Sequence, residues 1–191
     1  KYKNNLVVYE KPKSAVAESF RSNRSSLQFL YNKIGIDESL GRTLMVTSSV
    51  SGEGKTFTSI NIATAYALSG KKTILLGLDL RKPKILDDFE ITNEEGIVNY
   101  LIGDSEIEEI KTTTHIENLD VIPSGPVPPN PSELLMSHRL KELMPKLRQE
   151  YDMIVLDTPP LGLVTDALEL TRYADRTIFM VRLDYTKKGM L

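Results

Sequence analysis

The clearest signal along this chain is an alternation of short, continuous apolar runs with longer segments whose apolar residues recur at helical spacing. Continuous apolar runs are typical of strands that are covered on both faces, as in a parallel sheet. The runs that predict strands are Thr43 to Thr47, Thr73 to Leu78, Leu119 to Ile122, Met153 to Asp157 and Thr177 to Arg182.

Helical patterns separate these runs. Ser14 to Tyr31 and Lys55 to Leu68 each carry an apolar stripe at a spacing of three and four residues, which predicts helices packed on a surface. A further helix start is predicted at Asn130-Pro131-Ser132-Glu133, because Asn caps helices, Pro suits the first position and Glu at the third can return a hydrogen bond. Strands that alternate with helices predict an α/β fold: a doubly wound, mostly parallel sheet with helices on both faces.

Composition narrows the class of protein. A length of 191 residues predicts one domain over residues 1–191, and 24 basic against 26 acidic residues give no general attraction to nucleic acid. The chain has no Cys and only two distant His residues, which excludes disulfides and the usual zinc sites. No apolar stretch approaches the roughly 18 to 20 residues of a membrane span. Any anion site must therefore be local.

A phosphate-binding loop follows the first predicted strand. Gly52 and Gly54 let the backbone turn its amide groups toward phosphate oxygens, Lys55 can bridge the outer phosphates and Thr56 can ligate Mg²⁺. The alternative, a flexible loop with a chance Lys-Thr pair, is disfavoured by the flanking strand and helix. The residues expected to contact the nucleotide are Ser49, Val50, Ser51, Gly52, Glu53, Gly54, Lys55, Thr56 and Phe57.

Two further strands end in a carboxylate. Asp157 closes a buried-type strand, as in a Walker B motif, and Asp79 follows another strand, with Arg81 and Lys82 available to attract an anion. The plainer alternatives are a turn-capping Asp157 and an exposed Asp79–Arg81 pair. Together with the loop, both carboxylates are expected to converge with Lys55 around one magnesium-bound triphosphate.

At this point the chain resembles the bacterial tyrosine kinases, the cytoplasmic kinases of capsule and exopolysaccharide assembly of the Wzc or CapB type. Lys55 and Thr56 match the family's Walker A motif, Asp79 the second aspartate of its Walker A′ motif and Asp157 its Walker B aspartate. The segment from Gly125 to Leu134 is similar to a family loop and helix. The resemblance implies a P-loop fold of the MinD and ParA kind.

The resemblance also implies an activity and a set of ligands. ATP and Mg²⁺ are the expected cofactors, with Lys55, Asp79 and Asp157 catalytic and Thr56, Asp79 and Asp157 at the metal. The expected reaction is phosphorylation of tyrosines on neighbouring subunits, which regulates polysaccharide polymerisation and export.

Glu18, Arg21 and Arg24 fit the family's E-x-x-R-x-x-R oligomerisation motif, within the predicted helix of residues 14–32. Three-residue spacing puts them on one broad flank of a helix, and the resemblance implies that this flank builds a ring. An intrahelical Glu18–Arg21 pair is the alternative. Other implied partners are a membrane-anchored co-polymerase region, in the same chain or as a separate activator, and a tyrosine phosphatase. The implied location is the cytoplasmic side of the inner membrane.

Three departures from the family pattern bear on the chemistry. Gly77 stands where many members carry the first Walker A′ aspartate. The C-terminal tyrosine cluster is absent, and the final strand and helix of the usual fold are expected to lie beyond the sequence.

Two rival functions stay open. A positioning ATPase of the MinD or ParA type shares the fold, although its additional loop lysine is replaced here by Val50. A nucleotide-binding regulatory module that has lost its chemistry is the other alternative, which Gly77 favours.

Overall fold

The computed structural model describes residues 5–33, 35, 37, 39–84, 89–162 and 166–190. Its centre is a six-stranded sheet with the order β3-β4-β2-β5-β1-β6. The strands are β1 (Arg42–Ser48), β2 (Thr73–Gly77), β3 (Thr112–Thr113), β4 (Leu119–Ile122), β5 (Met153–Asp157) and β6 (Arg176–Met180). Every neighbouring pair is parallel except β3 with β4. The predicted doubly wound, mostly parallel sheet is therefore confirmed.

The strand predictions differ in accuracy. β4 and β5 have the predicted bounds, β1 extends one residue further at each end, and β2 ends one residue earlier. β6 ends at Met180, two residues before the predicted Arg182, and its side chains alternate in exposure because it forms an edge of the sheet. β3 was not predicted, since two exposed threonines carry no apolar signal.

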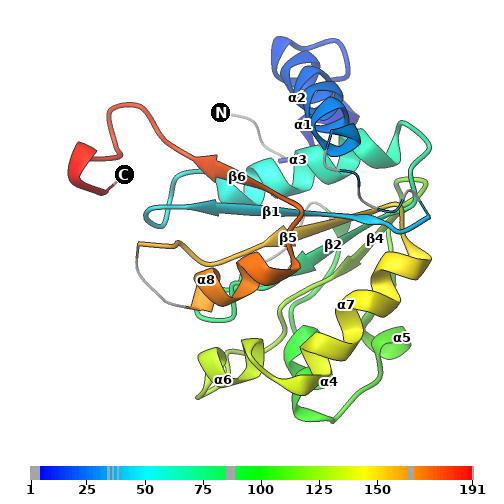
Figure 1. Cartoon of the computed structure of the whole chain (residues 1–191), viewed down its shortest axis with the longest axis vertical. Helices are drawn as coiled ribbons and strands as arrows, with labels where there is room; N and C mark the ends of the chain where they lie inside the picture. Colours follow the sequence, from blue (N-terminus) through cyan, green and yellow to red (C-terminus); the bar gives the residue numbers. More distant parts are fainter. Residues whose placement is uncertain are drawn as a thin grey trace.

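Helices cover both faces of the sheet, as Figure 1 shows. One face carries α1 (Val7–Glu10), α2 (Ala15–Asn32) and α3 (Lys55–Ala67); the other carries α4 (Ile97–Ile102), α5 (Ile107–Ile110), α6 (Pro131–Leu135), α7 (His138–Glu150) and α8 (Asp166–Leu170). Short 3₁₀ turns span Thr171–Tyr173 and Lys188–Met190. Among the described residues, no helix is both long and apolar enough to cross a bilayer.

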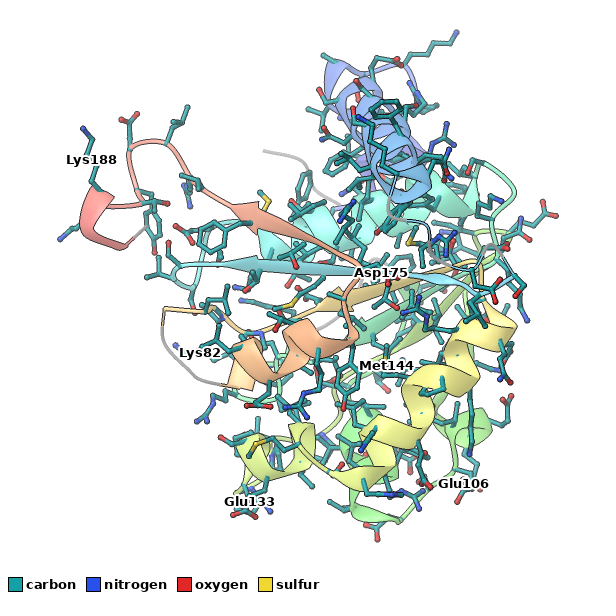
Figure 2. The ribbon with its side chains drawn as sticks, viewed as in Figure 1. Lys82, Glu106, Glu133, Met144, Asp175 and Lys188 are labelled. Carbon is teal, nitrogen blue, oxygen red and sulfur yellow. The ribbon has the colours of Figure 1, made fainter. Side chains whose placement is uncertain are left out.

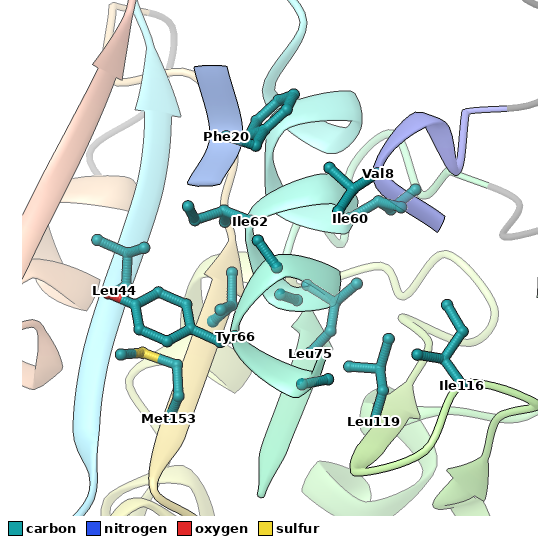
Figure 3. Packing of buried hydrophobic residues seen from close by; sticks show 14 of the residues in the cluster. Val8, Phe20, Leu44, Ile60, Ile62, Tyr66, Leu75, Ile116, Leu119 and Met153 are labelled. Atoms are coloured by element: carbon teal, nitrogen blue, oxygen red, sulfur yellow. The ribbon is translucent and has the colours of Figure 1, made fainter. Parts of the chain in front are cut away.

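The core on the α3 side is built in layers. Leu44 of β1 and Leu75 of β2 pack beneath Ile60 and Ile62 of α3, and Phe20 of α2 covers the helix from outside (Figure 3). Eleven of the thirteen residues of α3 are buried. The helix that leads away from the phosphate loop is thus enclosed between the sheet and the α1–α2 layer.

The predicted helix start at Asn130 needs a correction. Pro131 does open α6, but the Asn130 side chain does not cap it: its amide donates to Glu133 Oε2 at 2.8 Å instead. In a capping box the Glu133 carboxylate would accept a hydrogen bond from the Asn130 backbone amide. Here the carboxylate accepts from the Asn130 side chain instead. α6 ends at Leu135, and the longer helix α7 begins after its own cap, Ser137, whose hydroxyl accepts from the Leu140 amide at 3.4 Å.

Candidate nucleotide-binding and phosphoryl-transfer site

The loop between β1 and α3 has the backbone that a phosphate-binding loop requires. Gly52 and Gly54 adopt φ values of +87° and +94°, in the left-handed region that glycine tolerates without strain. The first turn of α3 begins directly at Lys55, so its unpaired amides and positive dipole end lie at the loop. This arrangement favours binding of an anion.

Asp157 is held against the start of α3. The Thr56 hydroxyl donates to Asp157 Oδ2 at 2.7 Å, and the Ser59 hydroxyl donates to Oδ1 at 3.2 Å. The parallel pairing of β1 with β5 sets Asp157 beside Val46, one strand over from the loop. The structure therefore brings the Walker B carboxylate to the loop, as predicted.

Asp79 lines the same cavity as Lys55. Its carboxylate accepts a hydrogen bond from the Lys82 amide at 3.1 Å. Lys55, Asp79 and Asp157 are only 7%, 8% and 6% exposed, so their charges act on one another with little screening by water. Both carboxylates lie near enough to Lys55 to offset part of the lowering of its ammonium pKa by burial, and Asp79 and Asp157 line a second, smaller pocket together.

A cavity of about 230 Å³ opens at this place. It is lined by Ser51, Gly52, Gly54, Lys55, Thr56, Phe57, Asp79, Lys82 and Lys84. Figure 2 shows Lys82 at the end of the sheet where β1 and β5 finish, opposite the end that carries Asp175. Three lysines around a glycine-rich loop give the cavity the charge that a polyphosphate needs.

The ionisation of the site follows from its burial. Burial raises the pKa of the Asp157 carboxyl to about 6, against the opposing effects of the Thr56 hydrogen bond and the Lys55 charge. Burial also lowers the pKa of the Lys55 ammonium, although Asp157 and Asp79 partly restore it. A cation that binds beside Asp157 therefore has to displace a proton at mildly acid pH.

The oxygen atoms gathered here fit Mg²⁺. A hydroxyl from Thr56 and a carboxylate from Asp157 are in direct contact, and Asp79 lines the same cavity. Hard oxygen donors of this kind are what Mg²⁺ takes beside a substrate phosphate, usually with several waters retained.

The predicted loop residues divide into two groups. Ser51, Gly52, Gly54, Lys55, Thr56 and Phe57 line the cavity, whereas Ser49, Val50 and Glu53 do not. The buried Glu53 carboxylate accepts hydrogen bonds from the Val50 amide at 2.9 Å and the Ser49 hydroxyl at 3.2 Å. Hydrogen bonds among these three residues stabilise the loop without contributing to the cavity wall.

The cations after β2 were only partly predicted. Arg81 does not line the cavity, and its guanidinium donates to Ser132 Oγ at 2.8 Å at the start of α6. Lys82 and Lys84 line the cavity instead. Lys84 was missed because a lone lysine after a proline forms no recognisable pattern.

Gly77 occupies a crowded position at the end of β2. A Cβ atom added there would lie 2.8 Å from Ser124 Oγ and 3.0 Å from the Ser124 amide nitrogen. The Ser124 hydroxyl also donates to the Gly77 carbonyl oxygen at 2.9 Å. Gly77 is therefore packed against Ser124, and a side chain there would require Ser124 to shift.

The residues of the predicted oligomerisation motif all lie on α2 and make separate contacts within the subunit. Glu18 and Arg21 form an exposed ion pair of 2.8 Å, and Arg24 turns toward α3, where it donates to the Ala65 carbonyl at 3.4 Å. Their role between subunits stays a prediction.

Larger hollows lie elsewhere on the molecule. One of about 370 Å³ is at the amino end of the sheet and is lined by residues that include Gln28, Arg42 and Arg148. It has no glycine-rich loop or strand-ending carboxylate, so the chemistry assigns the nucleotide to the smaller cavity.

The strand, glycine-rich loop and helix, beside strands that end in carboxylates, define the site of a P-loop nucleotide-binding protein. The family described as "AAA domain" matches residues 41–190. Tyrosine-protein kinase YwqD of Bacillus subtilis (strain 168) is 36% identical over 184 residues, which cover 96% of this chain and 76% of that one. The chain belongs to the bacterial tyrosine-protein kinase family.

Other comparisons define how far the likeness extends. The chimerical protein CapA2B2 has a TM-score of 0.90 at 35% identity, over 97% of this chain and 80% of that one. Tyrosine-protein kinase wzc of Salmonella typhi is 36% identical over 93% of this chain, but the match covers only 24% of that longer protein. The septum site-determining protein MinD of Pyrococcus horikoshii OT3, with a TM-score of 0.61 at 24% identity, over 74% of this chain and 58% of that one, shares the fold alone.

Proposed function

We propose that this chain transfers the γ-phosphoryl group of ATP to tyrosine hydroxyls, in particular those of a neighbouring subunit. Membership of the tyrosine-protein kinase family supports the reaction class. The observation that carries the proposal is the arrangement of three residues from separate segments beside the phosphate loop. Lys55 and Asp79 line one cavity, and Asp157 is hydrogen-bonded to Thr56, which lines the same cavity.

Each of these residues has a defined task. The loop amides and Lys55 hold the β- and γ-phosphates and stabilise the charge that develops during transfer. The tyrosine oxygen bonds to the γ-phosphorus as the bond to the β-phosphate oxygen breaks, ADP leaves, and Asp79 accepts the tyrosine proton. Thr56 and Asp157 are placed to hold Mg²⁺, which, when bound, neutralises phosphate charge.

The test separates binding from transfer. Calorimetry with Mg-ADP reports whether the cavity binds nucleotide, and Mg-ATP with a tyrosine-containing peptide reports transfer by phosphotyrosine detection. We expect Lys55→Met to remove transfer by at least about 10²-fold. The matched control is Lys71→Met, which changes an exposed lysine beyond the far end of α3. A wild type that binds nucleotide but is as inert as Lys55→Met would contradict kinase activity.

We extend the proposal to the cellular setting. The subunits form a ring through Glu18, Arg21 and Arg24. They act beside a membrane-anchored region of the same chain or beside a separate activator. A tyrosine phosphatase removes the phosphoryl groups that they transfer. The much greater length of the wzc relative supports a membrane-associated arrangement, and names such as "putative tyrosine-protein kinase in cps region" support a role in polysaccharide production. Sedimentation of Arg21→Ala against wild type tests the ring.

One observation favours a second candidate, a nucleotide-binding regulatory module. The packing of Ser124 against Gly77 leaves a single carboxylate, Asp79, after β2. Such a module would bind Mg-ATP in the experiment above and phosphorylate nothing.

A further inference from the structure

A tight turn formed by residues 182–186, here called the 182–186 turn, follows β6 and lies against the phosphate loop. The Thr186 amide donates to the Arg182 carbonyl at 2.9 Å, and the Arg182 amide donates to Thr186 Oγ1 at 2.9 Å. The Arg182 guanidinium also stacks over the Tyr185 ring, 5.0 Å from its centre. In Figure 2 the chain continues from this turn to Lys188 at the same end of the sheet as Lys82.

Two side chains of the turn bind successive carbonyl groups of the phosphate loop. The Tyr185 hydroxyl donates to the Ser51 carbonyl oxygen at 3.1 Å. Arg182 Nη1 donates to the Gly52 carbonyl oxygen, also at 3.1 Å. Both bonds pull the carbonyl groups toward the turn.

Because the peptide bond is planar, a contact that fixes a carbonyl group also fixes the direction of the next residue's amide group. In a trans peptide the carbonyl oxygen and the next residue's amide hydrogen point in opposite directions. A Ser51 carbonyl held toward Tyr185 therefore aims the Gly52 amide away from the turn, and a Gly52 carbonyl held toward Arg182 does the same for the Glu53 amide. Inward-directed amides of this kind are the phosphate ligands of such loops.

Gly52 makes the contact sterically possible. A Cβ atom added there would lie 3.1 Å from Tyr185 Oη, and its φ of +87° disfavours any other residue. The missing side chain thus leaves the space that the Tyr185 hydroxyl uses.

The third contact of the turn reaches the back of the loop. The Thr186 hydroxyl donates to the Glu53 carboxylate, which also accepts from the Val50 amide and the Ser49 hydroxyl. Burial raises the pKa of the Glu53 carboxyl, but the hydrogen bonds it accepts, the Thr186 bond foremost, outweigh burial and leave the pKa below its usual value. Glu53 is therefore a charged acceptor shared by the loop and the turn.

We infer that Arg182, Tyr185 and Thr186 are positioning residues that hold the phosphate loop in the shape that binds nucleotide phosphates. The inference rests on the proposed function, because it requires the loop to bind a nucleotide. It makes the affinity for nucleotide dependent on a segment 133 residues away from the loop in the sequence.

Calorimetric titration of Mg-ADP into five proteins tests the inference: wild type, Tyr185→Phe, Thr186→Val, Thr186→Ser and Tyr9→Phe. Tyr185→Phe removes only a hydroxyl, and Thr186→Val removes the hydroxyl that donates to Glu53 and accepts from the Arg182 amide. Each change is expected to weaken binding about two- to tenfold. Thr186→Ser keeps the hydroxyl and should restore wild-type affinity. Tyr9→Phe removes a hydroxyl from a similarly exposed tyrosine in α1, 42% against 48% exposed, and should change nothing.

The outcomes are distinct. Wild type that gives no binding heat overturns the proposed function. Wild-type binding with equal affinity in Tyr185→Phe and Thr186→Val overturns the positioning role alone. Thermal melts on the same samples test whether the effect is only a loss of stability. If it is, Thr186→Val lowers the melting temperature and Thr186→Ser fails to restore affinity. That result also overturns the inference.

Discussion

The two halves of the site differ in how many hydrogen bonds hold their carboxylates in place. In the half formed by β1, β5 and α3, Asp157 accepts hydrogen bonds from two hydroxyls, and the loop is braced by Glu53. In the half formed by the end of β2, Asp79 accepts a hydrogen bond from one backbone amide, and Gly77, two residues before it, has no side chain. In the function proposed above, the task of the first half is to bind phosphate and metal, and the task of the second is to activate the acceptor. We conclude that nucleotide binding is more firmly specified by this chain than the chemical step is.

The largest effect should come from the weaker half. Asp79→Asn keeps the shape of the side chain but cannot accept the tyrosine proton, so transfer should fall about 10²- to 10⁴-fold. The affinity for Mg-ADP should change less than about tenfold, because Asp157 and Lys55 remain. Phosphotyrosine formation and calorimetry measure the two quantities, with Asp104→Asn at the end of α4 as control. Near-normal transfer in Asp79→Asn would assign the proton to another group.

The firmer half should respond to pH. With the Asp157 pKa at about 6, Mg-nucleotide has to displace a proton below that pH, so its affinity should fall about tenfold for each pH unit lost there. Asp157→Asn should bind weakly and without this pH dependence. Calorimetry between pH 5 and about 7.5 tests both. An equal slope in wild type and Asp157→Asn would place the titrating group elsewhere.

The same group affects the stability of the nucleotide-free protein. The carboxyl pKa is 3.8 when unfolded and about 6 when folded, so the folded state binds more protons over this window. Stability is greatest below about pH 4 for this group and falls by up to about 3 kcal/mol as the pH rises to 6. Asp157→Asn should abolish this contribution in denaturant titrations.

The crowded strand end gives the next effect in size. Gly77→Asp should reduce the free energy of unfolding by about 1–3 kcal/mol, because its Cβ meets Ser124, and should not increase transfer. Gly77→Ala separates crowding from charge and should show most of the same loss. Adding Ser124→Ala should recover part of it. A Gly77→Asp protein of full stability and higher activity would show that the strand end accommodates a second carboxylate freely.

The smallest effect should come from Ser59. Ser59→Ala removes one of two hydroxyl donors to Asp157, so the pKa of that carboxyl should rise and Mg-nucleotide should bind about two- to fivefold more weakly near neutral pH. Calorimetry at two pH values distinguishes this from simple misfolding, since raising the pH should restore the affinity.

Sequence reasoning succeeded where the signal is local. The phosphate loop, β4, β5, Asp157 at the end of β5 and Asp79 shortly after β2 each depend on a few contiguous residues, so the sequence pattern alone predicts them. It failed where the contact joins distant segments: Ser59 meets Asp157 across 98 residues, and nothing near either residue indicates the pairing. Asn130 failed for another reason, since its side chain had two possible partners of similar chemistry and took Glu133 rather than the backbone.

The enclosure of α3 has a consequence for how the molecule moves. Its amide hydrogens should exchange with deuterium among the slowest in the chain, because almost every side around it is occupied. Arg24 of α2 bonds the Ala65 carbonyl near its far end, and the Val8 amide donates to Asn61 in its middle at 2.9 Å. We therefore expect α3 to move together with the two amino-terminal helices if it shifts as a rigid body when a nucleotide enters or leaves.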